Sequence, residues 1–377
     1  MNPWARRSSV GRLIVFKVGS STLMGPDGEL DVAFVRSMCE QICELKRRGD
    51  RVVLVSSGAA AVGRSLLGFT ERPSDIPTLQ ACAAAGQTTL IERYAEVLAQ
   101  DGVRCAQVLL TRGDVVDRTG YLNARNTFER LLDLGVLPIV NENDTVSVRE
   151  FSFGDNDMLG AIVSSLIDAD SYVILSDIDG LYTANPDTDP TATLVERVER
   201  VDANVIAMAG GAGSSYGTGG MATKIRAARA MLAAGIPMTI CRGRGDGALV
   251  NAADGRGLRT VFECPGEGTH EQARKLWIGL AGVSRGSVRI DAGACRALES
   301  EGASLLPVGV TGVEGPFDEG DTVNVLGPDG QLVARGITRY SSDELVRVHG
   351  LRLDVIARFV PERADCPVIH RDELLVF

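Results

Sequence analysis

The sequence predicts an α/β protein in which a mostly parallel sheet lies between two helical layers, followed by a small domain rich in β-strands. Short apolar runs of strand length alternate with longer amphipathic segments through the first two thirds of the 377 residues. This alternation is typical of a parallel sheet covered by helices. The hydrophobic content of 45% provides enough apolar side chains for two domains, each with its own core.

The first domain is expected to contain six strands and five main helices. The strands are predicted at 13–18, 52–56, 103–110, 136–140, 172–176 and 237–240. The helices are predicted at 32–48, 78–99, 123–134, 157–167 and 221–234. Polar clusters follow four of the strands, at 17–21, 56–59, 141–144 and 176–177. Since ligands bind beyond the carboxyl ends of strands in open sheets, we expect a site there.

The pattern changes at about residue 280. Turn signals at 315–316 and 327–330 separate short β-rich segments at 321–326 and 331–339, which predicts a small, mainly β domain. The expected organisation is a main domain at 1–265, a linker at 266–280 and a C-terminal domain at 281–377.

The charge balance limits the possible partners. The 39 basic and 49 acidic residues give a net charge of −10, which argues against broad affinity for nucleic acid or anionic membranes. An anionic substrate must therefore be held locally. We find no credible signal peptide and no apolar run near the roughly 20 residues that a membrane helix needs. A soluble, cytoplasmic protein is expected.

The eight cysteines form no C-x-x-C pair, so reduced thiols are expected rather than a disulfide framework. Cys39 and Cys43 lie one helical turn apart, a spacing that could hold a metal. The segment around them has the pattern of an ordinary amphipathic helix without a nearby histidine, which favours core packing.

Two glycine-rich turns carry the chemistry that the sequence points to most clearly. Lys17 lies in the turn at 15–21 and Lys224 ends the turn at 218–224. Glycines, hydroxyls and a lysine make a suitable cradle for phosphate, because backbone N–H groups can approach the anion closely. Lys17 alone could equally be a surface lysine at a strand end. If folding brings the two lysines together, they can bracket a phosphoryl group during transfer.

Neither turn is a P-loop. The segment at 217–222 fits the loose dinucleotide pattern G-x-G-x-x-[GA], but it follows a run of small residues at 210–216 instead of a strand. A loop that closes over phosphates is therefore preferred to a nicotinamide or flavin site.

Short acids and amides form a third cluster, at 141–144 and 154–157. Such residues often serve only as turn formers. Here Asn141 follows an apolar strand and Asp157 precedes an apolar helix, so either Asp155 or Asp157 could cap the helix while the other acts in catalysis. The three histidines lie only in the linker or the C-terminal domain. An acceptor carboxylate is already ionised at neutral pH and needs no base, so this absence fits a kinase that acts on an acid.

Taken together, these segments resemble the glutamate 5-kinases of the amino acid kinase family over nearly the whole chain. The matching motifs lie at 16–21, 56–59, 122–125, 139–144, 154–157, 179–183 and 217–224. The resemblance implies a three-layer α/β/α amino acid kinase fold. It also implies transfer of the γ-phosphoryl group of ATP to the side-chain carboxylate of L-glutamate, the first step of proline biosynthesis.

The resemblance also assigns roles to residues. Lys17 and Lys224 would stabilise the transferring group, and Asp157 would hold both ammonium groups. The implied glutamate-binding residues are Ser57, Asp144, Asn156 and Asn141. The implied nucleotide-binding residues are Lys17, Ser176, Asp177, Thr218, Gly219, Gly220, Met221, Ala222, Thr223 and Lys224. Mg²⁺ would arrive with ATP, held mainly by the phosphates, and no separate metal site is predicted.

The C-terminal segment resembles the PUA domain, a small β-barrel also found in RNA-modifying enzymes. Residues 281–377 contain ten arginines, no lysine and fifteen acidic residues, a net charge of −5, whereas an RNA reader should present a basic face. The family resemblance further implies a homo-oligomer, feedback inhibition by proline and a glutamyl phosphate reductase as partner. Two alternatives stay open: a kinase for aspartate, N-acetylglutamate or carbamate, and an RNA-binding protein that uses the C-terminal barrel.

Overall fold

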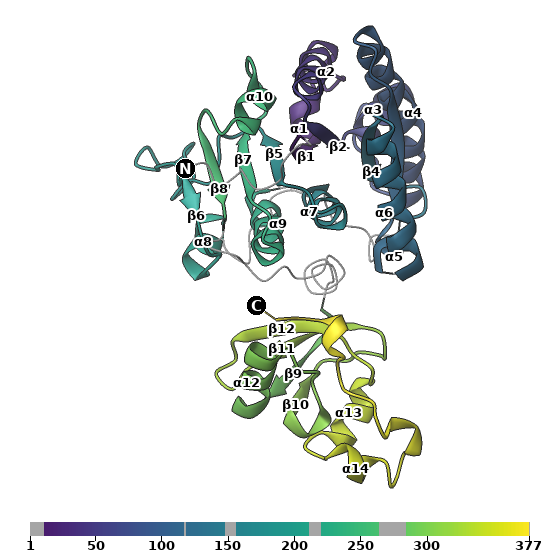
Figure 1. The fold of residues 1–377 in the computed structure, drawn as a ribbon, viewed down its shortest axis with the longest axis vertical. Helices are drawn as coiled ribbons and strands as arrows, with labels where there is room; N and C mark the ends of the chain where they lie inside the picture. The colour runs from purple at the N-terminus through teal and green to yellow at the C-terminus, as the bar shows by residue number, and fades with distance from the viewer. Residues whose placement is uncertain (1–10, 117, 148–155, 211–219, 264–283, 377) are drawn as a thin grey trace. The chain divides into compact units, whose positions relative to one another are not determined.

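The computed structural model describes residues 11–116, 118–147, 156–210, 220–263 and 284–376 (Figure 1). The chain divides into two compact units, Met1–His270 and Glu271–Phe377. The expected linker at 266–280 lies outside the described residues, so the boundaries at 265 and 281 stay predictions.

An eight-stranded sheet forms the centre of the first unit, with the strand order β3-β4-β2-β1-β5-β7-β8-β6. The strands are β1 (Leu13–Val18), β2 (Arg51–Ser56), β3 (Cys105–Leu110), β4 (Leu137–Glu142), β5 (Ser171–Ser176), β6 (Arg197–Val198), β7 (Met238–Arg242) and β8 (Arg259–Phe262). All neighbouring strands are parallel except β7 and β8, which run antiparallel. The predicted mostly parallel α/β sheet is confirmed.

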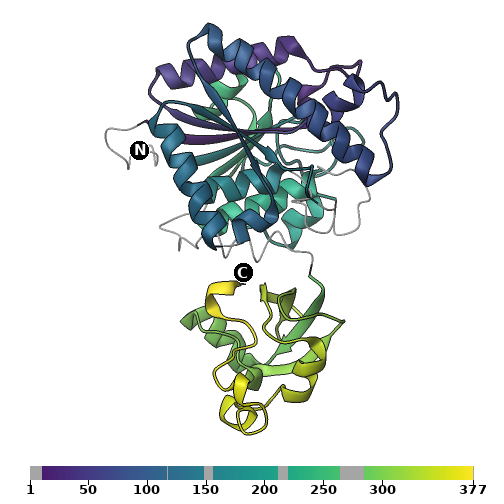
Figure 2. The same cartoon turned by 90° about the vertical axis from the view of Figure 1, so that its right-hand side faces the viewer.

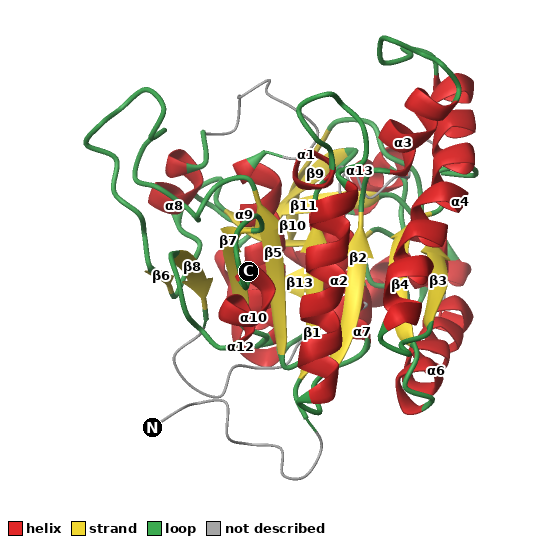
Figure 3. Cartoon of the chain, turned by 90° about the horizontal axis from the view of Figure 1, so that it is seen from above, coloured by secondary structure: helices red, strands yellow, loops and turns green. Residues whose placement is uncertain are grey.

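Helices cover both faces of this sheet (Figure 2). The helices are α1 (Ser20–Leu23), α2 (Val32–Arg47), α3 (Ala59–Leu66), α4 (Ile76–Gln100), α5 (Arg112–Val116), α6 (Arg118–Asp133), α7 (Asn156–Leu166), α8 (Ala203–Met208), α9 (Met221–Ala234) and α10 (Ala248–Ala253). Helices α2, α4 and α10 lie on one face, and α6, α7 and α9 lie on the other. Figure 3 shows α2 running along the central strands β1 and β2. This is the three-layer arrangement that the sequence predicts.

The sequence explains why the central elements form where they do. Every residue of β1 is buried, as expected for an apolar run in the middle of a parallel sheet. Helix α2 begins after Asp31, whose carboxylate accepts a hydrogen bond from the Phe34 backbone N–H. Helix α9 ends at Gly235, which has a φ of 67°, a left-handed conformation that glycine adopts readily. A capping aspartate thus marks the start of α2, and a left-handed glycine marks the end of α9.

Helices α3 and α4 form a hairpin in which the two backbones touch. A Cβ atom on Gly63 would lie 1.7 Å from the carbonyl oxygen of Cys82, and one on Gly86 would lie 1.9 Å from that of Ala59. Only glycine fits at either position. Helix α3 was not expected from the sequence, because it has only eight residues, starts with three alanines and begins after Gly58 rather than after a capping serine, threonine or aspartate.

The second unit contains a five-stranded mixed sheet in the order β10-β9-β11-β12-β13. Its strands are β9 (Gly286–Ile290), β10 (Val310–Glu314), β11 (Thr322–Leu326), β12 (Leu332–Ile337) and β13 (Leu374–Val376). Its helices are α12 (Ala292–Glu301), α13 (Ser342–Val348) and α14 (Leu353–Ile356), with 3-10 turns η2 (Pro307–Gly309), η3 (Pro361–Arg363) and η4 (Arg371–Glu373). A separate cluster of buried side chains, including Val288, Val323 and Tyr340, forms the core of this unit. None of the described helices of the chain is long and apolar enough to span a membrane.

Candidate active site

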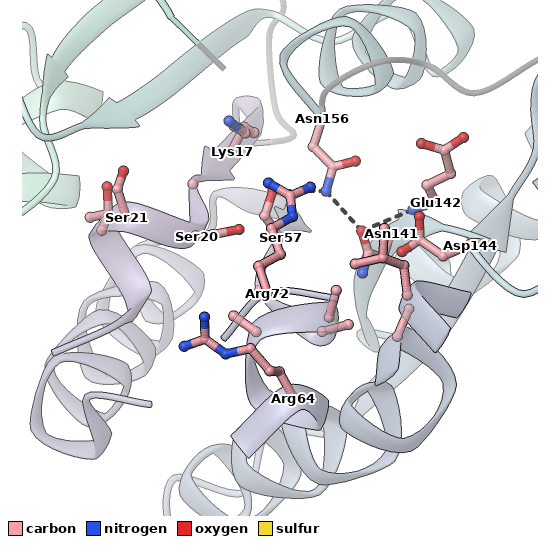
Figure 4. Close-up of a pocket in the computed structure, with 18 of the residues that line it drawn as sticks. Lys17, Ser20, Ser21, Ser57, Arg64, Arg72, Asn141, Glu142, Asp144 and Asn156 are labelled. Carbon is pink, nitrogen blue, oxygen red and sulfur yellow. Dashed lines mark hydrogen bonds between the residues drawn. The ribbon is translucent and has the colours of Figure 1, made fainter. Parts of the chain in front are cut away.

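The carboxyl ends of the central strands border one large cavity. Val18 at the end of β1 pairs with Ser56 at the end of β2, and β5 ends on the other side of β1 at Ser176. The cavity has a volume of about 860 Å³ (Figure 4). Predicted site residues that line it are Lys17, Ser57, Asn141, Asp144, Asn156, Ser176, Asp177, Gly220 and Lys224.

Two of the four lysines in the sequence meet at a single carboxylate beside this cavity. Lys17 Nζ lies 2.5 Å from Asp157 Oδ1, and Lys224 Nζ lies 3.1 Å from Asp157 Oδ2. The exposed fractions are 5% for Lys17, 7% for Lys224 and 0% for Asp157. The structure therefore brings the two lysine turns together, as the sequence analysis expected, and places Asp157 between them.

The electrostatics of this cluster favour a charged carboxylate. Burial of Asp157 opposes its ionisation, but the two ammonium groups outweigh burial and hold its pKa below the ordinary value. The Thr223 hydroxyl donates a hydrogen bond to Asp157 Oδ2 at 2.9 Å. The Tyr172 hydroxyl donates to the backbone carbonyl of Asp157 at 2.8 Å, which fixes the start of α7. Two cations held by one anion leave a net positive charge on this cluster of three side chains.

The turn after β1 has the geometry of an anion cradle. A Cβ atom on Gly19 would lie 3.6 Å from Lys17 Nζ, 3.8 Å from Ser21 Oγ and 4.0 Å from Thr22 Oγ1. The bare backbone of Gly19 is therefore surrounded by an ammonium group and two hydroxyls, the donors that phosphate oxygens require.

The residues predicted to bind nucleotide lie near the same end of the sheet. Gly220 precedes α9, and the residues from Met221 through Ala222 and Thr223 to Lys224 form its first turn. Ser176 ends β5, and its hydroxyl donates to Asp177 Oδ1 at 3.0 Å. Thr218 and Gly219 lie outside the described residues, as does Asp155.

An amide network forms another wall of the cavity. Asn156 Nδ2 donates to Ser57 Oγ at 2.9 Å and to Asn141 Oδ1 at 2.7 Å (Figure 4). Asn141 Nδ2 donates in turn to Gln87 Oε1 at 2.7 Å. Sequence reasoning missed Gln87, which lies in an alanine-rich stretch of α4 without a motif. These hydrogen bonds fix the orientation of the Asn141 and Asn156 amide groups toward a ligand.

The acidic side of the cavity is formed by the loop after β4. The Ser147 hydroxyl donates to Glu142 Oε1 at 2.6 Å. Asp144 is half-buried and has no hydrogen bond or ion pair with any other described residue. Burial raises the pKa of Asp144. A partly desolvated carboxylate without a cation is suited to bind an ammonium group.

Sequence comparison gives the family. The amino acid kinase family matches residues 12–242 and the PUA domain matches residues 286–360. A glutamate 5-kinase from Geobacter sp. (strain M21) is 45% identical over 363 residues, which covers 96% of this chain and 97% of the relative. The chain belongs to the glutamate 5-kinase family.

Other glutamate 5-kinases agree with this assignment. The one from Burkholderia multivorans is 46% identical, over 96% of this chain and 97% of its own. The one from Thermosynechococcus vestitus is 44% identical, over 97% of this chain and 100% of its own. Among solved structures, UMP kinase from Ureaplasma parvum has a TM-score of 0.45 and 14% identity, covering 68% of this chain and 100% of that chain. The predicted family and the predicted C-terminal PUA domain are confirmed.

Proposed function

We propose that this glutamate 5-kinase family member transfers the γ-phosphoryl group of ATP to the side-chain carboxylate of L-glutamate and forms L-glutamyl 5-phosphate, the first step of proline biosynthesis. The observation that carries the proposal is the buried cluster of Lys17, Asp157 and Lys224 at the edge of a cavity. The same cavity contains the carboxylate of Asp144, which pairs with no other residue that the structure describes. The cavity thus combines a positive region for phosphoryl oxygens with a negative region for an amino group.

In the proposed reaction, a carboxylate oxygen of glutamate bonds to the γ-phosphorus while the bond from that phosphorus to the β–γ bridging oxygen breaks. ADP leaves with the electron pair of the broken bond. The acceptor is ionised at neutral pH, so no side chain has to remove a proton. The work of the protein is therefore to position the two reactants and to neutralise charge on the transferring group.

We assign that neutralisation to Lys17 and Lys224. Fixed positive groups in a site with little water stabilise a charged transition state more strongly than mobile groups in solution. Asp157 contacts both ammonium groups and would keep them in place throughout the reaction. Ser57, Asn141 and Asn156 would orient the substrate through the amide network, and Asp144 would bind its ammonium group.

The nucleotide would lie across Ser176, Asp177 and the first turn of α9, with Mg²⁺ on its phosphates. When bound, Mg²⁺ neutralises phosphate charge and assists the departure of ADP. In the described part of the chain, no group of three or more His, Cys, Asp or Glu residues could hold a metal ion. We expect the ligands of this ion to come mainly from ATP and water.

Further parts of the proposal rest on family membership. We expect a cytoplasmic homo-oligomer that proline inhibits and whose product passes to a glutamyl phosphate reductase. Exposed apolar side chains at Leu66, Leu67 and Phe69 support association between copies, because they would be covered in an oligomer. Light scattering of the purified protein measures the oligomeric state directly.

The decisive assay for the reaction combines the protein with ATP, Mg²⁺ and L-glutamate in the presence of hydroxylamine, which traps an acyl phosphate as its hydroxamate. Hydroxamate should form only when glutamate is added. Aspartate, N-acetylglutamate and carbamate are tested in the same way and in competition. A failure to form glutamate-dependent hydroxamate, or a preference for one of the other acids, would overturn the proposal.

A further inference from the structure

Two arginines line the cavity without a role in the reaction described above. Arg64 lies on α3, and Arg72 lies in the loop between α3 and α4. Across the ranges that the structure describes, neither side chain forms an ion pair or a side-chain hydrogen bond, and Arg64 Nε is buried without a partner. The cavity therefore contains two guanidinium groups that form no ion pair with a carboxylate of the described residues.

The backbone around Arg72 is fixed on both sides. Arg72 precedes Pro73, and a residue before proline is restricted to extended conformations. Shortly after, the Asp75 carboxylate accepts a hydrogen bond from the Thr78 backbone N–H at 2.9 Å and caps α4. Before the loop, α3 is held against α4 by the close approach of Gly63 to the other helix. The loop that carries Arg72 is exposed, but it joins two helices that pack closely against each other.

The side chains of the two arginines extend in different directions. Figure 4 shows the Arg72 guanidinium extending into the cavity in the direction of Ser57 and Asn156. The Arg64 guanidinium lies farther from both in this view. Of the two arginines that line the cavity, Arg72 is the one whose guanidinium is directed toward the amide network in this view.

The charges of the substrate supply the missing partner. At neutral pH, glutamate has a side-chain carboxylate, an α-ammonium group and an α-carboxylate. The lysine pair suits the reacting carboxylate and Asp144 suits the ammonium group, which leaves the α-carboxylate without a protein cation. A guanidinium group presents two parallel N–H donors that match a carboxylate.

We propose that Arg72 binds the α-carboxylate of the substrate and thereby contributes to the selection of an α-amino acid. This inference rests on the proposed function of the same cavity. Arg72 does not touch the transferring phosphoryl group, so its loss should weaken substrate binding and leave the chemistry of the bound substrate largely intact.

The test combines Arg72→Gln with substrates that lack one charged group. Glutarate lacks the ammonium group, and 4-aminobutyrate lacks the α-carboxylate. For Arg72→Gln, kcat/KM should fall by about 10- to 150-fold for L-glutamate and glutarate, the effect of losing a hydrogen bond to a charged group. It should stay unchanged for 4-aminobutyrate, and the KM for ATP should also stay unchanged. Each analogue is also measured as a competitive inhibitor of glutamate phosphorylation, which gives an inhibition constant even where its own turnover is slow.

Two further variants sharpen the result. Arg72→Lys keeps the charge and should restore part of the lost affinity for glutamate, but not the paired geometry. Arg93→Gln, on an exposed position of α4 that pairs with Glu96, is the matched control and should leave all constants unchanged.

The inference is overturned if Arg72→Gln keeps the wild-type KM for glutamate, as a purely solvated side chain would. An equal loss for glutarate and 4-aminobutyrate would overturn it as well, because it would show a general disturbance of the loop. Failure of the proposed function looks different, since the wild-type protein would then form no hydroxamate with glutamate at all.

Discussion

At the scale of single residues, Asp157 determines how the positive charge of the site is arranged. It is fully buried and contacts Lys17 and Lys224, which are themselves almost fully buried. Without its carboxylate, two ammonium groups would lie side by side out of contact with water. The same residue therefore contributes to stability and to the position of the two proposed catalytic cations.

We predict that Asp157→Asn lowers the free energy of unfolding by about 3–5 kcal/mol, the cost of breaking a buried ion pair, and lowers kcat by about a hundredfold or more. Urea denaturation and the hydroxamate assay measure the two effects.

The stability that Asp157 contributes should depend on pH. Because the native pKa of Asp157 is lowered, its stabilisation is present above the unfolded pKa of about 3.9 and is lost as the pH falls through the native pKa. Equal stability of both proteins at neutral pH would contradict this account.

The two lysines should matter for turnover. Lys17→Ala or Lys224→Ala should each reduce kcat by about a hundredfold or more, because a fixed charge at the transferring group is lost. Lys46→Ala is the matched control, since the Lys46 ammonium donates to the carbonyl of Gly135 and does not line the cavity. Near-normal turnover of either active-site variant would show that phosphoryl transfer occurs elsewhere.

Asp144 should make glutamate binding sensitive to pH. Only its ionised form attracts an ammonium group, and burial raises its pKa, so protonation begins at a less acidic pH than for an ordinary aspartate. The kcat/KM for glutamate should therefore fall as the pH is lowered, with a smaller effect on kcat at saturation. Asp144→Asn should lower kcat/KM at neutral pH. It should also remove the fall in kcat/KM that protonation of Asp144 causes at lower pH. Identical profile shapes for both proteins would exclude the assigned role.

At the scale of secondary-structure elements, α7 places the site by packing directly on β5. A Cβ atom on Gly160 of α7 would lie 2.3 Å from the hydroxyl oxygen of Tyr172 on β5, and that hydroxyl binds the backbone of Asp157. The contact between helix and strand leaves no space for a methyl group. The first two residues of α7, Asn156 and Asp157, are thus held at a fixed height above the sheet.

Gly160→Ala should therefore displace Tyr172 and the start of α7. We expect a loss of about 1–3 kcal/mol in the free energy of unfolding, typical of overpacking, together with a lower kcat. Gly113→Ala on α5 is the matched control, because its Cβ would meet only Thr111 Oγ1 at 3.6 Å. Similar stability and activity of the two variants would show that α7 can move without consequence.

The elements also show what the sequence could predict and why the rest was missed. The bounds of β1 and α9 agree with the prediction, because apolar patterning and flanking glycines mark both clearly. Helix α3 was missed because it is short and packs against α4 through Gly63 and Gly86, a contact that no local sequence pattern indicates. Gln87 and Arg72 were missed for the same reason, since only the folded hairpin brings Arg72 to the cavity and Gln87 within hydrogen-bond distance of Asn141. Lys17, Asn141 and Ser176 were found because they lie at the carboxyl ends of β1, β4 and β5, which meet at the same edge of the sheet.

At the scale of the whole molecule, all described residues of the candidate site belong to the first unit, and each unit has its own buried cluster. We predict that a chain ending at residue 270 folds and keeps kcat for hydroxamate formation within about tenfold of the full-length value. Circular dichroism confirms folding before the assay. A folded but inactive truncated protein would mean that the second unit contributes to catalysis.

The second unit should not bind RNA through its charge. Several of its arginines are engaged in ion pairs, Arg339 with Glu373 and Arg363 with both Glu319 and Glu344. Residues 281–377 also have a net charge of −5, so we expect the second unit to attract the phosphates of RNA only weakly. A gel shift with RNA at micromolar protein should show no complex. A salt-sensitive complex would contradict the expectation.

The meeting of Lys17 and Lys224 at Asp157 has a consequence for the newly made protein. The three side chains come from β1, α7 and α9, so a nascent chain on the ribosome lacks its second ammonium group until α9 has emerged and docked. A chain that has not yet been made beyond residue 224 should therefore turn over ATP far more slowly than the folded first unit, and the onset of full activity should report that Lys224 has reached Asp157.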